Sequence, residues 1–495
     1  MTTSSVPLVR KLAKTRIVAT VGPACADKKI LQQLILAGVD VFRLNFAHGS
    51  HDWLESVLSN IRRTSARLGI PVGVLGDLSG PKIRLGELTD GGVMCQEGSI
   101  FHFVKDDTVA DSSHLTCTYD KLIEDLESGD RILLADGTVS MLVMEKAEDG
   151  TSVSCLVVEP GLIRSRQGVN LPGVKLSTPT VTGKDESDLI WALKNDLDFI
   201  GMSFVRSAND IRQLRNLIHS ASPEVNPLIV AKIEKPEAIA DLDAILEATD
   251  AVMVARGDLG VEVEISRVPI LQKDIIRRCN EQRIPVITAT QMLDSMQTNE
   301  LPTRAEVSDV VNAIIDGTDA VMLSGETAIG EHPVTCVKMM EKISVEAEPL
   351  AAQMSVPDQI SQQVRRAGPV TEAVAIGAVA VAQELNASLI VVATETGRTA
   401  LALSRQRSNV PILAVTHLED TARRMCLYWG VHSLKSAIVR QPAEALLQYV
   451  VQWGMKHRTL KSGSRVIVVG RTDWLGDGHD LMMVHEVPED FSAVS

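Results

Sequence analysis

The sequence lacks three features, and each absence excludes a class of protein. Its seven cysteines are odd in number and none form a C-x-x-C pair, so we expect neither a disulfide framework nor a zinc site. No segment approaches about 18 consecutive apolar residues, and "MTTSSVPLVRKLAKTR" has no apolar core, which predicts a cytoplasmic chain without a signal peptide or membrane span. Positive charge is not in excess either, because a net charge of −14 argues against general binding to nucleic acid or membranes.

What is present is typical of a globular protein with several domains. Apolar residues make up 45% of the chain and charged residues 23%. A length of 495 residues allows about two to four domains. Any site for an anionic ligand must be local, because the overall charge is negative.

One theme repeats from residue 15 to about 345: a short apolar run, polar residues at its end, then a helical pattern. Such runs are typical of parallel strands covered by helices. Eight of them predict a closed (β/α)8 TIM barrel, with an open doubly wound sheet as the alternative because a count does not prove closure. The runs are "TRIVATV", "VDVFRLNF", "PVGVLGD", "DFIGMSF", "LIVAKIE", "AVMVARGD", "PVITATQ" and "AVMLSGE".

The repeat is interrupted once and ends before the C-terminus. Short strand-like pieces such as "SIFHFV" and "TSVSCLVVEPG" predict a small β domain inserted in a barrel loop. A second α/β pattern follows the linker "AAQMSVPDQISQQVRRAGP". We therefore predict a barrel from 1–84 and 179–348, an inserted β domain from 85–178, and a C-terminal α/β domain from 349–495.

Polar side chains close seven of the eight predicted barrel strands, the second to the eighth. In a (β/α)8 barrel these ends converge at the catalytic mouth, and i, i+2 pairs point to one face. Polar residues also gather wherever strands meet solvent, but charges inside apolar runs favour a site, since buried ions are costly unless paired or used. The candidates are Arg43, Asn45, Asp77, Ser203, Lys232, Glu234, Asp258, Thr290, Ser324 and Glu326.

Two carboxylates from adjacent strands predict a metal site. Glu234 and Asp258 supply hard oxygen ligands without histidine or cysteine, which favours Mg²⁺ or Mn²⁺. Lys232 beside them could neutralise a transferring phosphoryl group and a developing enolate. The "ARGDLG" turn is expected to expose the N–H groups of Gly257 and Asp258 to a substrate carboxylate, with Thr290 as a further donor.

Eight segments from about Thr15 onward resemble, in order, the signature segments of the pyruvate kinases. They are "TRIVATVGPA", "RLNFAHG", "GVNLPG", "AKIE", "MVARGDLG", "ATQML", "PTRAEVSDVVNA" and "MLSGETAIG". The resemblance implies a barrel, a mobile lid, a C-terminal regulatory domain and usually a homotetramer. It also implies transfer of the phosphoryl group of phosphoenolpyruvate to ADP, which gives pyruvate and ATP.

The resemblance assigns roles to individual residues. Lys232 would stabilise the phosphoryl group and the enolate, while Glu234 and Asp258 would hold the metal. Thr290 and Ser324 would relay the proton that forms pyruvate, supported by Glu326. The substrate-binding residues would be Arg43, Lys232, Ser203, Gly257, Asp258 and Thr290. The nucleotide-binding residues would be Arg43, Asn45, His48, Arg84 and, in the lid, Asp136.

The sequence departs from the common pattern at the family's potassium site. Ala47 and Leu78 stand where most relatives have serine and threonine ligands, so only Asn45 and Asp77 remain. Lys82 replaces a nearby glutamate, and its ammonium could take the electrostatic place of K⁺. This resembles the subgroup that works without potassium; the alternative is a degraded site with a solvated lysine.

Two further departures concern the lid and the C-terminal domain. Gln167 stands where relatives usually have lysine, so the nucleotide contact of that lysine either passes to Arg166 or is weaker. A loop with Thr394, Thr396, Arg398 and Thr399 resembles the family's effector phosphate site. Glu395 and the Asp-rich "GRTDWLGDGHD" favour a sugar monophosphate or AMP over a bisphosphate.

Two rival functions stay open at the level of sequence. One is a metal-dependent aldolase or lyase of the phosphoenolpyruvate and pyruvate superfamily, which also places acidic residues around Mg²⁺. It does not explain the inserted domain or "MLSGET". The other is an inactive sensor of phosphorylated metabolites, which would require the loss of a central group.

Overall fold

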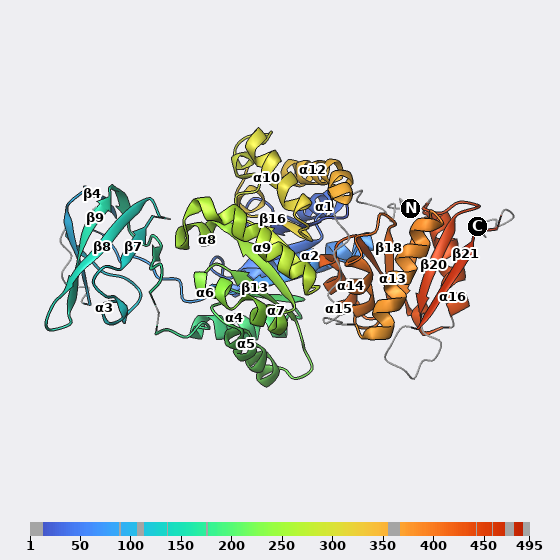
Figure 1. The fold of residues 1–495 in the computed structure, drawn as a ribbon, viewed down its shortest axis with the longest axis horizontal. Helices are drawn as coiled ribbons and strands as arrows, with labels where there is room; N and C mark the ends of the chain where they lie inside the picture. Colours follow the sequence, from blue (N-terminus) through green and yellow to red (C-terminus); the bar gives the residue numbers. More distant parts are fainter. Residues whose placement is uncertain are drawn as a thin grey trace.

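The computed structural model describes residues 13–88, 91–105, 113–135, 137–174, 177–354, 367–441, 443–457, 459–470 and 480–488. A β domain lies at one end of the elongated molecule, a barrel in the middle and an α/β domain at the other end (Figure 1). Within these ranges, no helix combines the length and hydropathy that crossing a membrane requires.

Eight parallel strands close into a barrel, which confirms the predicted fold and excludes the open sheet. Their order around the barrel is β1-β16-β15-β14-β13-β12-β3-β2. All residues of β14 are buried, as expected for a strand covered on both faces. The strands are β1 (Arg16–Thr20), β2 (Val41–Asn45), β3 (Gly73–Asp77), β12 (Phe199–Met202), β13 (Leu228–Ile233), β14 (Ala251–Ala255), β15 (Val286–Ala289) and β16 (Ala320–Leu323).

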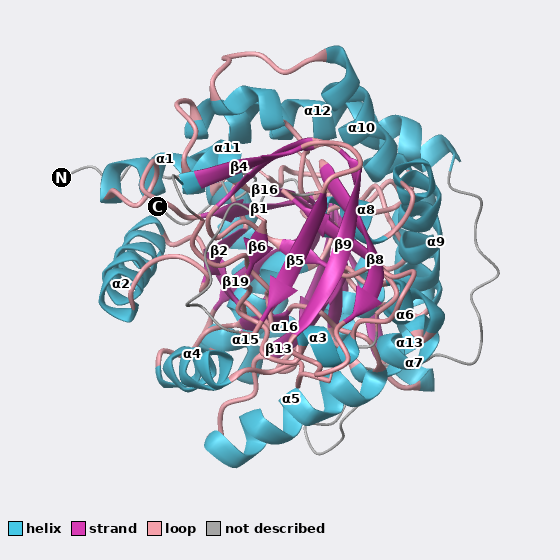
Figure 2. Ribbon diagram, turned by 90° about the vertical axis from the view of Figure 1, so that its left-hand side faces the viewer, coloured by secondary structure: helices cyan, strands magenta, loops and turns pink. Residues whose placement is uncertain are grey.

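Helices form a ring outside these strands, seen from the β-domain end in Figure 2. Capping boxes at Thr182 and Thr303 satisfy N-terminal amides of α4 and α10. The α-helices are α1 (Lys28–Ala37), α2 (His51–Leu68), α4 (Gly183–Lys194), α5 (Ala208–Ala221), α6 (Pro236–Ala240), α7 (Leu242–Ala248), α8 (Arg256–Glu262), α9 (Val268–Glu281), α10 (Arg304–Ile315), α11 (Gly325–Ala328) and α12 (Pro333–Met354). Two 3-10 helices are η2 (Ile265–Arg267) and η3 (Asp294–Gln297).

The inserted β domain, which we call the lid domain, lies between β3 and β12 in the sequence. A six-stranded sheet, β11-β7-β8-β9-β5-β6, and a two-stranded sheet, β10-β4, enclose their own apolar core. The lid domain touches the barrel where Nδ2 of Asn170 donates to Oε1 of Glu262 at 3.1 Å. Its elements are β4 (Gly92–Cys95), β5 (Ile100–Val104), β6 (His114–Leu115), α3 (Leu122–Asp125), β7 (Arg131–Leu134), β8 (Val139–Lys146), β9 (Ser152–Glu159), β10 (Gly161–Arg164) and β11 (Val169–Asn170).

The C-terminal α/β domain has a five-stranded sheet of order β19-β18-β17-β20-β21, in which only β21 runs antiparallel. The predicted linker is partly helical, because α12 continues to Met354, and 355–366 lies outside the described residues. The elements are α13 (Pro369–Glu384), β17 (Leu389–Ala393), α14 (Arg398–Ser404), β18 (Ile412–Thr416), α15 (Glu419–Arg424), η4 (Met425–Leu427), β19 (Val431–Lys435), η5 (Ala437–Arg440), α16 (Ala443–Lys456), β20 (Arg465–Gly470) and β21 (Leu481–Glu486).

Candidate active site

Lys232 lies at the centre of a charged cluster at the C-terminal ends of the barrel strands. Its Nζ is 2.8 Å from Oε1 of Glu234 and 3.4 Å from Oδ1 of Asp77. It also donates to Oγ of Ser203 at 2.6 Å. The side chains of Lys232 and Glu234 thus share one face, as their i, i+2 spacing predicts.

Asp77 joins this lysine to a second cation. Nη2 and Nε of Arg43 lie 2.6 and 2.7 Å from Oδ2 of Asp77, and Nη1 donates to Oγ1 of Thr20 at 3.1 Å. Burial alone would raise the pKa of Asp77, but Lys232 and Arg43 lower it below its usual value. Burial alone would lower the pKa of Lys232, but Asp77 and Glu234 raise it. Lys232 therefore stays charged.

Ser203 and the residue after it complete the wall beside Lys232. Oγ of Ser203 donates to the carbonyl of Leu78 at 2.7 Å, so this hydroxyl links two strand ends. The amide of Phe204 donates to Oε2 of Glu234 at 2.9 Å. Phe204 adopts a positive φ of 56°, an uncommon conformation for an aromatic residue. The site is therefore built on constrained backbone.

The two predicted metal ligands have the chemistry that a hard divalent cation needs. The pKa of Glu234 is raised, because its carboxylate is buried and lies near the negative charge of Asp258. The positive charge of Lys232 opposes this shift. Among the described residues, the carboxylate of Asp258 has no hydrogen-bond or ion-pair partner. No group of three or more histidine, cysteine or acidic side chains in the described ranges could hold a metal by itself. The pair fits Mg²⁺ or Mn²⁺, which keep water and substrate oxygens as further ligands.

The structure corrects the prediction for the "ARGDLG" turn in one respect, the amide of Gly257. Gly257 and Asp258 lie in α8 and not in an open turn. The amide of Gly257 is not free, because it donates to Oγ1 of Thr290 at 2.8 Å. That hydroxyl in turn donates to the carbonyl of Ala289 at 2.6 Å. A substrate carboxylate would therefore have to displace Thr290 from the Gly257 amide or bind beside it.

Ser324 and Glu326 have different surroundings. Oγ of Ser324 is buried and makes no hydrogen bond with the described residues. Glu326 is also buried, and its carboxylate accepts the amides of Ser324 at 2.7 Å and Leu293 at 3.1 Å. Burial raises the pKa of Glu326. Glu326 thus holds the loops around Ser324, which leaves the Ser324 hydroxyl open to other partners.

Comparisons with known proteins show the family of this chain. A model of the "Pyruvate kinase, barrel domain" matches residues 12–337, and a model of the "Pyruvate kinase, alpha/beta domain" matches residues 372–485. The chain belongs to the pyruvate kinase family. It is 39% identical to the pyruvate kinase of Geobacillus stearothermophilus over 96% of this chain and 81% of that protein. It is 42% identical to pyruvate kinase 2 of a Synechocystis strain over 97% of this chain and 80% of that protein.

A solved structure of a pyruvate kinase from Cryptosporidium parvum shares the whole fold. It superposes with a TM-score of 0.88 at 34% identity and covers 98% of both chains. The chain is thus a phosphotransferase of the pyruvate kinase type. This excludes the alternative of an aldolase or lyase.

The residues predicted from the pyruvate kinase resemblance to meet nucleotide are not all brought together. Asn45 is at the end of β2, and Oδ1 of Asn45 accepts the amide of Ala47 at 3.1 Å. His48, three residues after Asn45, is exposed. Arg84 instead contacts the lid domain, where its Nη1 donates to the carbonyl of Arg166 at 3.1 Å. Asp136 lies outside the described residues.

Lys82 does not reach the predicted cation site in this structure. Its side chain is exposed and forms no ion pair with the described residues, while Asp77 pairs with Arg43 and Lys232. Leu78 is buried in the barrel core. The structure therefore leaves the role of Lys82 as a prediction.

Arg166 and Gln167, the two lid residues considered for nucleotide contact, bind other residues of the lid domain. Arg166 pairs with Glu87 at 2.5 Å, and both side chains are exposed. The side-chain oxygen of Gln167 accepts the amide of Arg164 at 2.6 Å. Neither contact leads toward Lys232.

Of the predicted effector residues, Thr394 and Thr396 lie in the turn before α14, and Arg398 and Thr399 are the first two residues of that helix. Oγ1 of Thr394 accepts the amide of Gly397 at 3.0 Å, and Nε of Arg398 donates to Oγ1 of Thr396 at 3.3 Å. Thr399 is buried within α14. The late Asp-rich loop falls mostly in 471–479, outside the described residues.

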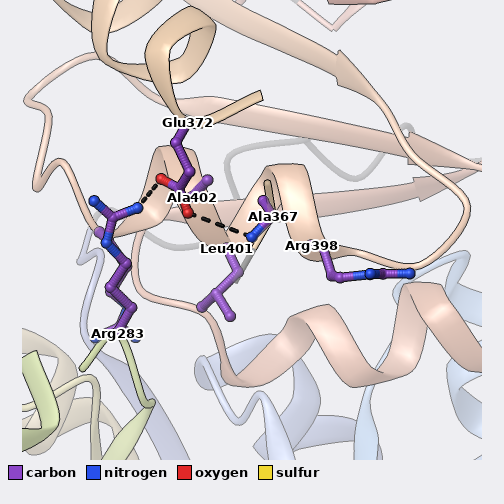
Figure 3. A pocket seen from close by; sticks show the side chains of 7 residues that line it. Arg283, Ala367, Glu372, Arg398, Leu401 and Ala402 are labelled. Atoms are coloured by element: carbon purple, nitrogen blue, oxygen red, sulfur yellow. Dashed lines mark hydrogen bonds and ion pairs between the residues drawn. The ribbon is translucent and has the colours of Figure 1, made fainter. Parts of the chain in front are cut away.

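Arg398 also lines a small cleft between the C-terminal domain and the barrel (Figure 3). Across it Arg283 of the barrel forms an ion pair with Glu372 at the start of α13, whereas Arg398 extends away from this pair. The cleft is thus closed by an interdomain ion pair.

Sequence reasoning missed one buried residue at the site, Arg256. Its Nη2 donates to the carbonyls of Thr290 at 2.7 Å and Gln291 at 3.3 Å, and its Nη1 pairs with Asp309 at 2.6 Å. Thr290 and Gln291 both have positive φ, 69° and 53°. Arg256 therefore braces a strained turn. An arginine within "AVMVARGD" was the available signal.

Proposed function

We propose that this chain transfers the phosphoryl group of phosphoenolpyruvate to ADP and protonates the resulting enolate, giving pyruvate and ATP in the last step of glycolysis. The observation that carries the proposal is the buried cluster of Lys232, Arg43, Asp77 and Glu234. Preorganised charge of this kind stabilises a transferring phosphoryl group and an enolate oxygen without reorganisation during the reaction.

Lys232 and Arg43 act on the phosphoenolpyruvate phosphate in this proposal. Both cations are already oriented by Asp77, so little entropy is lost when the substrate binds. The remaining substrate contacts are assigned to Ser203, Gly257, Asp258 and Thr290. The proton for the enolate is assigned to Thr290 and Ser324, and the buried, unpartnered hydroxyl of Ser324 among the described residues supports this role.

Glu234 and Asp258 would hold Mg²⁺ or Mn²⁺. When bound, such an ion neutralises phosphate charge and polarises substrate oxygens. The support is that the buried carboxylate of Glu234 faces the negative charge of Asp258, which a divalent cation between them would offset.

Asn45, His48 and Arg84, with Arg43 and the lid residue Asp136, are proposed to bind ADP and ATP. The support is the position of Asn45 and Arg43 on the same strand, β2, beside the phosphoryl site. Because Arg84 contacts the lid domain, its role requires the lid to approach the barrel. Arg166 is proposed in place of the usual lid lysine.

One coupled assay with phosphoenolpyruvate, ADP and Mg²⁺ tests the function. Lys232→Met should lower kcat by at least about 10²–10³-fold, since it removes the central donor. Removal of Mg²⁺ with a chelator should abolish the rate of the unmodified chain. An inactive sensor would show no turnover at all.

Lys235→Met is the matched control. Lys235 is also buried and pairs with a buried acid, Glu262, at 2.6 Å, so either variant leaves one unpaired charge and should cost about 3–5 kcal/mol of stability. Of these two lysines, Lys232 pairs with Asp77 and Lys235 pairs with Glu262. Equal losses of kcat in the two variants would contradict the assignment.

We further propose that the activity does not require potassium. Ala47 has no side-chain oxygen, Leu78 is buried in the core, and Asp77 is occupied by two cations. The proposed role of Lys82 requires its ammonium to turn from solvent toward Asn45 and Asp77.

A titration with KCl against tetramethylammonium chloride at constant ionic strength tests this proposal. We expect the same rate with and without K⁺, and Lys82→Glu should make the rate depend on K⁺ because it restores a carboxylate. Lys338→Glu, on the exposed side of α12, is the control for a change of charge. Strong stimulation of the unmodified chain by K⁺ would contradict the proposal.

Four further assignments remain, of which the effector site and the homotetramer rest on the family resemblance and the other two on sequence patterns. We propose a sugar monophosphate or AMP as effector at Thr394, Thr396, Arg398 and Thr399. We propose a homotetramer and a cytoplasmic location. We also propose the domain limits 1–84 with 179–348, 85–178 and 349–495, which are consistent with the strands on either side of the insertion.

A further inference from the structure

Three side chains form a hydrogen-bonded chain beside the turn that follows β2. Nζ of Lys184, in the first turn of α4, donates to the carbonyl of Phe46 at 2.7 Å. The same ammonium contacts Oδ2 of Asp188 at 2.6 Å, and Oδ1 of Asp188 meets Nε2 of His51 at 2.7 Å. None of these three residues has a role in the proposed chemistry.

Burial and aromatic contacts hold the hydrogen-bonded side chains of Lys184, Asp188 and His51 in place. The side chain of Asp188 is only 5% exposed, and each of its oxygens is bound. The His51 ring stacks on Trp191 with centroids 5.6 Å apart and an interplanar angle of 20°. Phe46 packs edge-on against the same indole at 5.7 Å and 82°. Aromatic contacts and a buried hydrogen-bonded carboxylate thus hold α4 and the end of β2 in one arrangement.

These hydrogen-bonded side chains contact the turn formed by residues 45–48. This turn has few internal hydrogen bonds: the amide of Ala47 donates to Oδ1 of Asn45 at 3.1 Å, and that of His48 to the carbonyl of Asn45 at 3.1 Å. Lys184 binds the carbonyl of Phe46, which lies inside this turn. The ammonium therefore fixes one of the peptides between Asn45 and His48, the two proposed nucleotide contacts.

The first turn of α4, which carries Lys184, is itself held by hydrogen bonds. Its capping box joins Thr182 and Asp185, and Oδ1 of Asp185 accepts the amide of Gly80 at 3.1 Å. Gly80 lies in the segment that leads from β3 into the lid domain, and α4 follows the segment that returns from it. The same helical turn therefore contacts the exits of both β2 and β3.

We propose that Lys184, Asp188 and His51 are positioning residues for ADP, acting by fixing the turn 45–48. The inference rests on the proposed function and deepens it. It does not extend to phosphoenolpyruvate, since none of the three touches Lys232, Asp77, Glu234 or Thr290 in the structure. Loss of the hydrogen bonds among Lys184, Asp188 and His51 should weaken ADP binding and leave phosphoenolpyruvate binding unchanged.

Steady-state kinetics with each substrate varied in turn test the proposal. Lys184→Met and Asp188→Asn should each raise KM for ADP by roughly tenfold, the effect of one hydrogen bond to a charged group. KM for phosphoenolpyruvate should not change. The variant with both substitutions should have no higher KM for ADP than Lys184→Met alone, because both substitutions break the same series of hydrogen bonds. Lys184→Arg, which keeps a donor for the Phe46 carbonyl, should recover most of the affinity.

Controls on the same helix separate positioning from loss of helix stability. Lys194→Met and Glu186→Gln make the same chemical changes at exposed positions of α4 and should leave both KM values unchanged. Calorimetric titration of ADP into each variant measures binding without turnover.

Two results would overturn the proposal. One is an equal rise in both KM values, which indicates general disruption. The other is a normal KM for ADP in Asp188→Asn beside a raised one in Lys184→Met, which indicates that Lys184 binds nucleotide directly. If the unmodified chain bound ADP but did not turn over phosphoenolpyruvate, the proposed function would fail while the titrations still tested the positioning.

Discussion

A single glycine, Gly201 on β12, sets how closely the backbone approaches the charged cluster. A Cβ at this position would lie 2.8 Å from Oδ1 of Asp77 and 3.4 Å from its Cα. That oxygen faces Lys232, so the missing side chain leaves room for the ion pair. At the scale of residues, the site depends on what is absent as much as on the charges that are present.

Gly201→Ala should therefore disturb both stability and activity. Overpacking against Asp77 should cost about 1–3 kcal/mol in the free energy of unfolding and lower kcat, because Asp77 orients both cations. Denaturant unfolding and the coupled assay measure the two effects.

Gly377→Ala is the control for the same substitution. A Cβ there meets no heavy atom within 4 Å and lies inside α13, so it should be neutral or stabilise by about 0.5–1 kcal/mol. Normal activity of the Gly201 variant would show that Asp77 has more freedom than the structure indicates.

At the scale of elements, the strands were predictable but their ends were not. Near-continuous apolar runs specified all eight barrel strands, because burial on both faces demands them. The quoted runs "AVMVARGD" and "AVMLSGE" continue past the strands, because β14 ends at Ala255 and β16 at Leu323, and short helices follow. At the end of β14, Arg256 binds the carbonyls of Thr290 and Gln291, a contact between segments far apart in sequence.

The same limit explains the mixed outcome for the site. The i, i+2 rule correctly put Lys232 and Glu234 on one face, since it depends only on local geometry. It could not tell that the amide of Gly257 is taken by Thr290, which lies 33 residues later. Nor could it locate Lys82, whose direction depends on how the chain leaves β3 for the lid domain.

At the scale of the whole molecule, aspartates at the closed end of the barrel join it to the C-terminal domain. Each directly precedes a strand and uses one oxygen to accept the amide at the start of a neighbouring strand. Three of them bind arginines that belong to, or contact, the C-terminal domain. The aspartates are Asp40, Asp198, Asp250 and Asp319. The domain that carries the proposed effector site is thus bonded to the bases of the strands whose tops form the active site.

Asp319→Asn should weaken the interaction between the barrel and the C-terminal domain. Asp319 is fully buried and pairs with Arg405 at 2.7 Å and Arg407 at 3.0 Å, so loss of its charge leaves buried arginines and should cost about 3–5 kcal/mol. Scanning calorimetry should show a lower transition temperature or a separate transition for the C-terminal domain.

Asp250→Asn provides the comparison. Its partner Arg215 belongs to the barrel and both side chains are partly exposed, so the cost should stay below about 1 kcal/mol. Equal effects of the two variants would argue against a special role for the interdomain pair.

The sequence by itself determined the class of fold, the family and the central chemical groups. Apolar runs, polar strand ends and the spacing of Lys232 and Glu234 are local properties that survive in any arrangement of the chain. Only the tertiary structure decided which partner each group has: Arg43 and Lys232 share Asp77, Thr290 takes the amide of Gly257, and Lys184 supports Phe46. These contacts join segments brought together by barrel closure, and strand register, not sequence distance, sets their geometry.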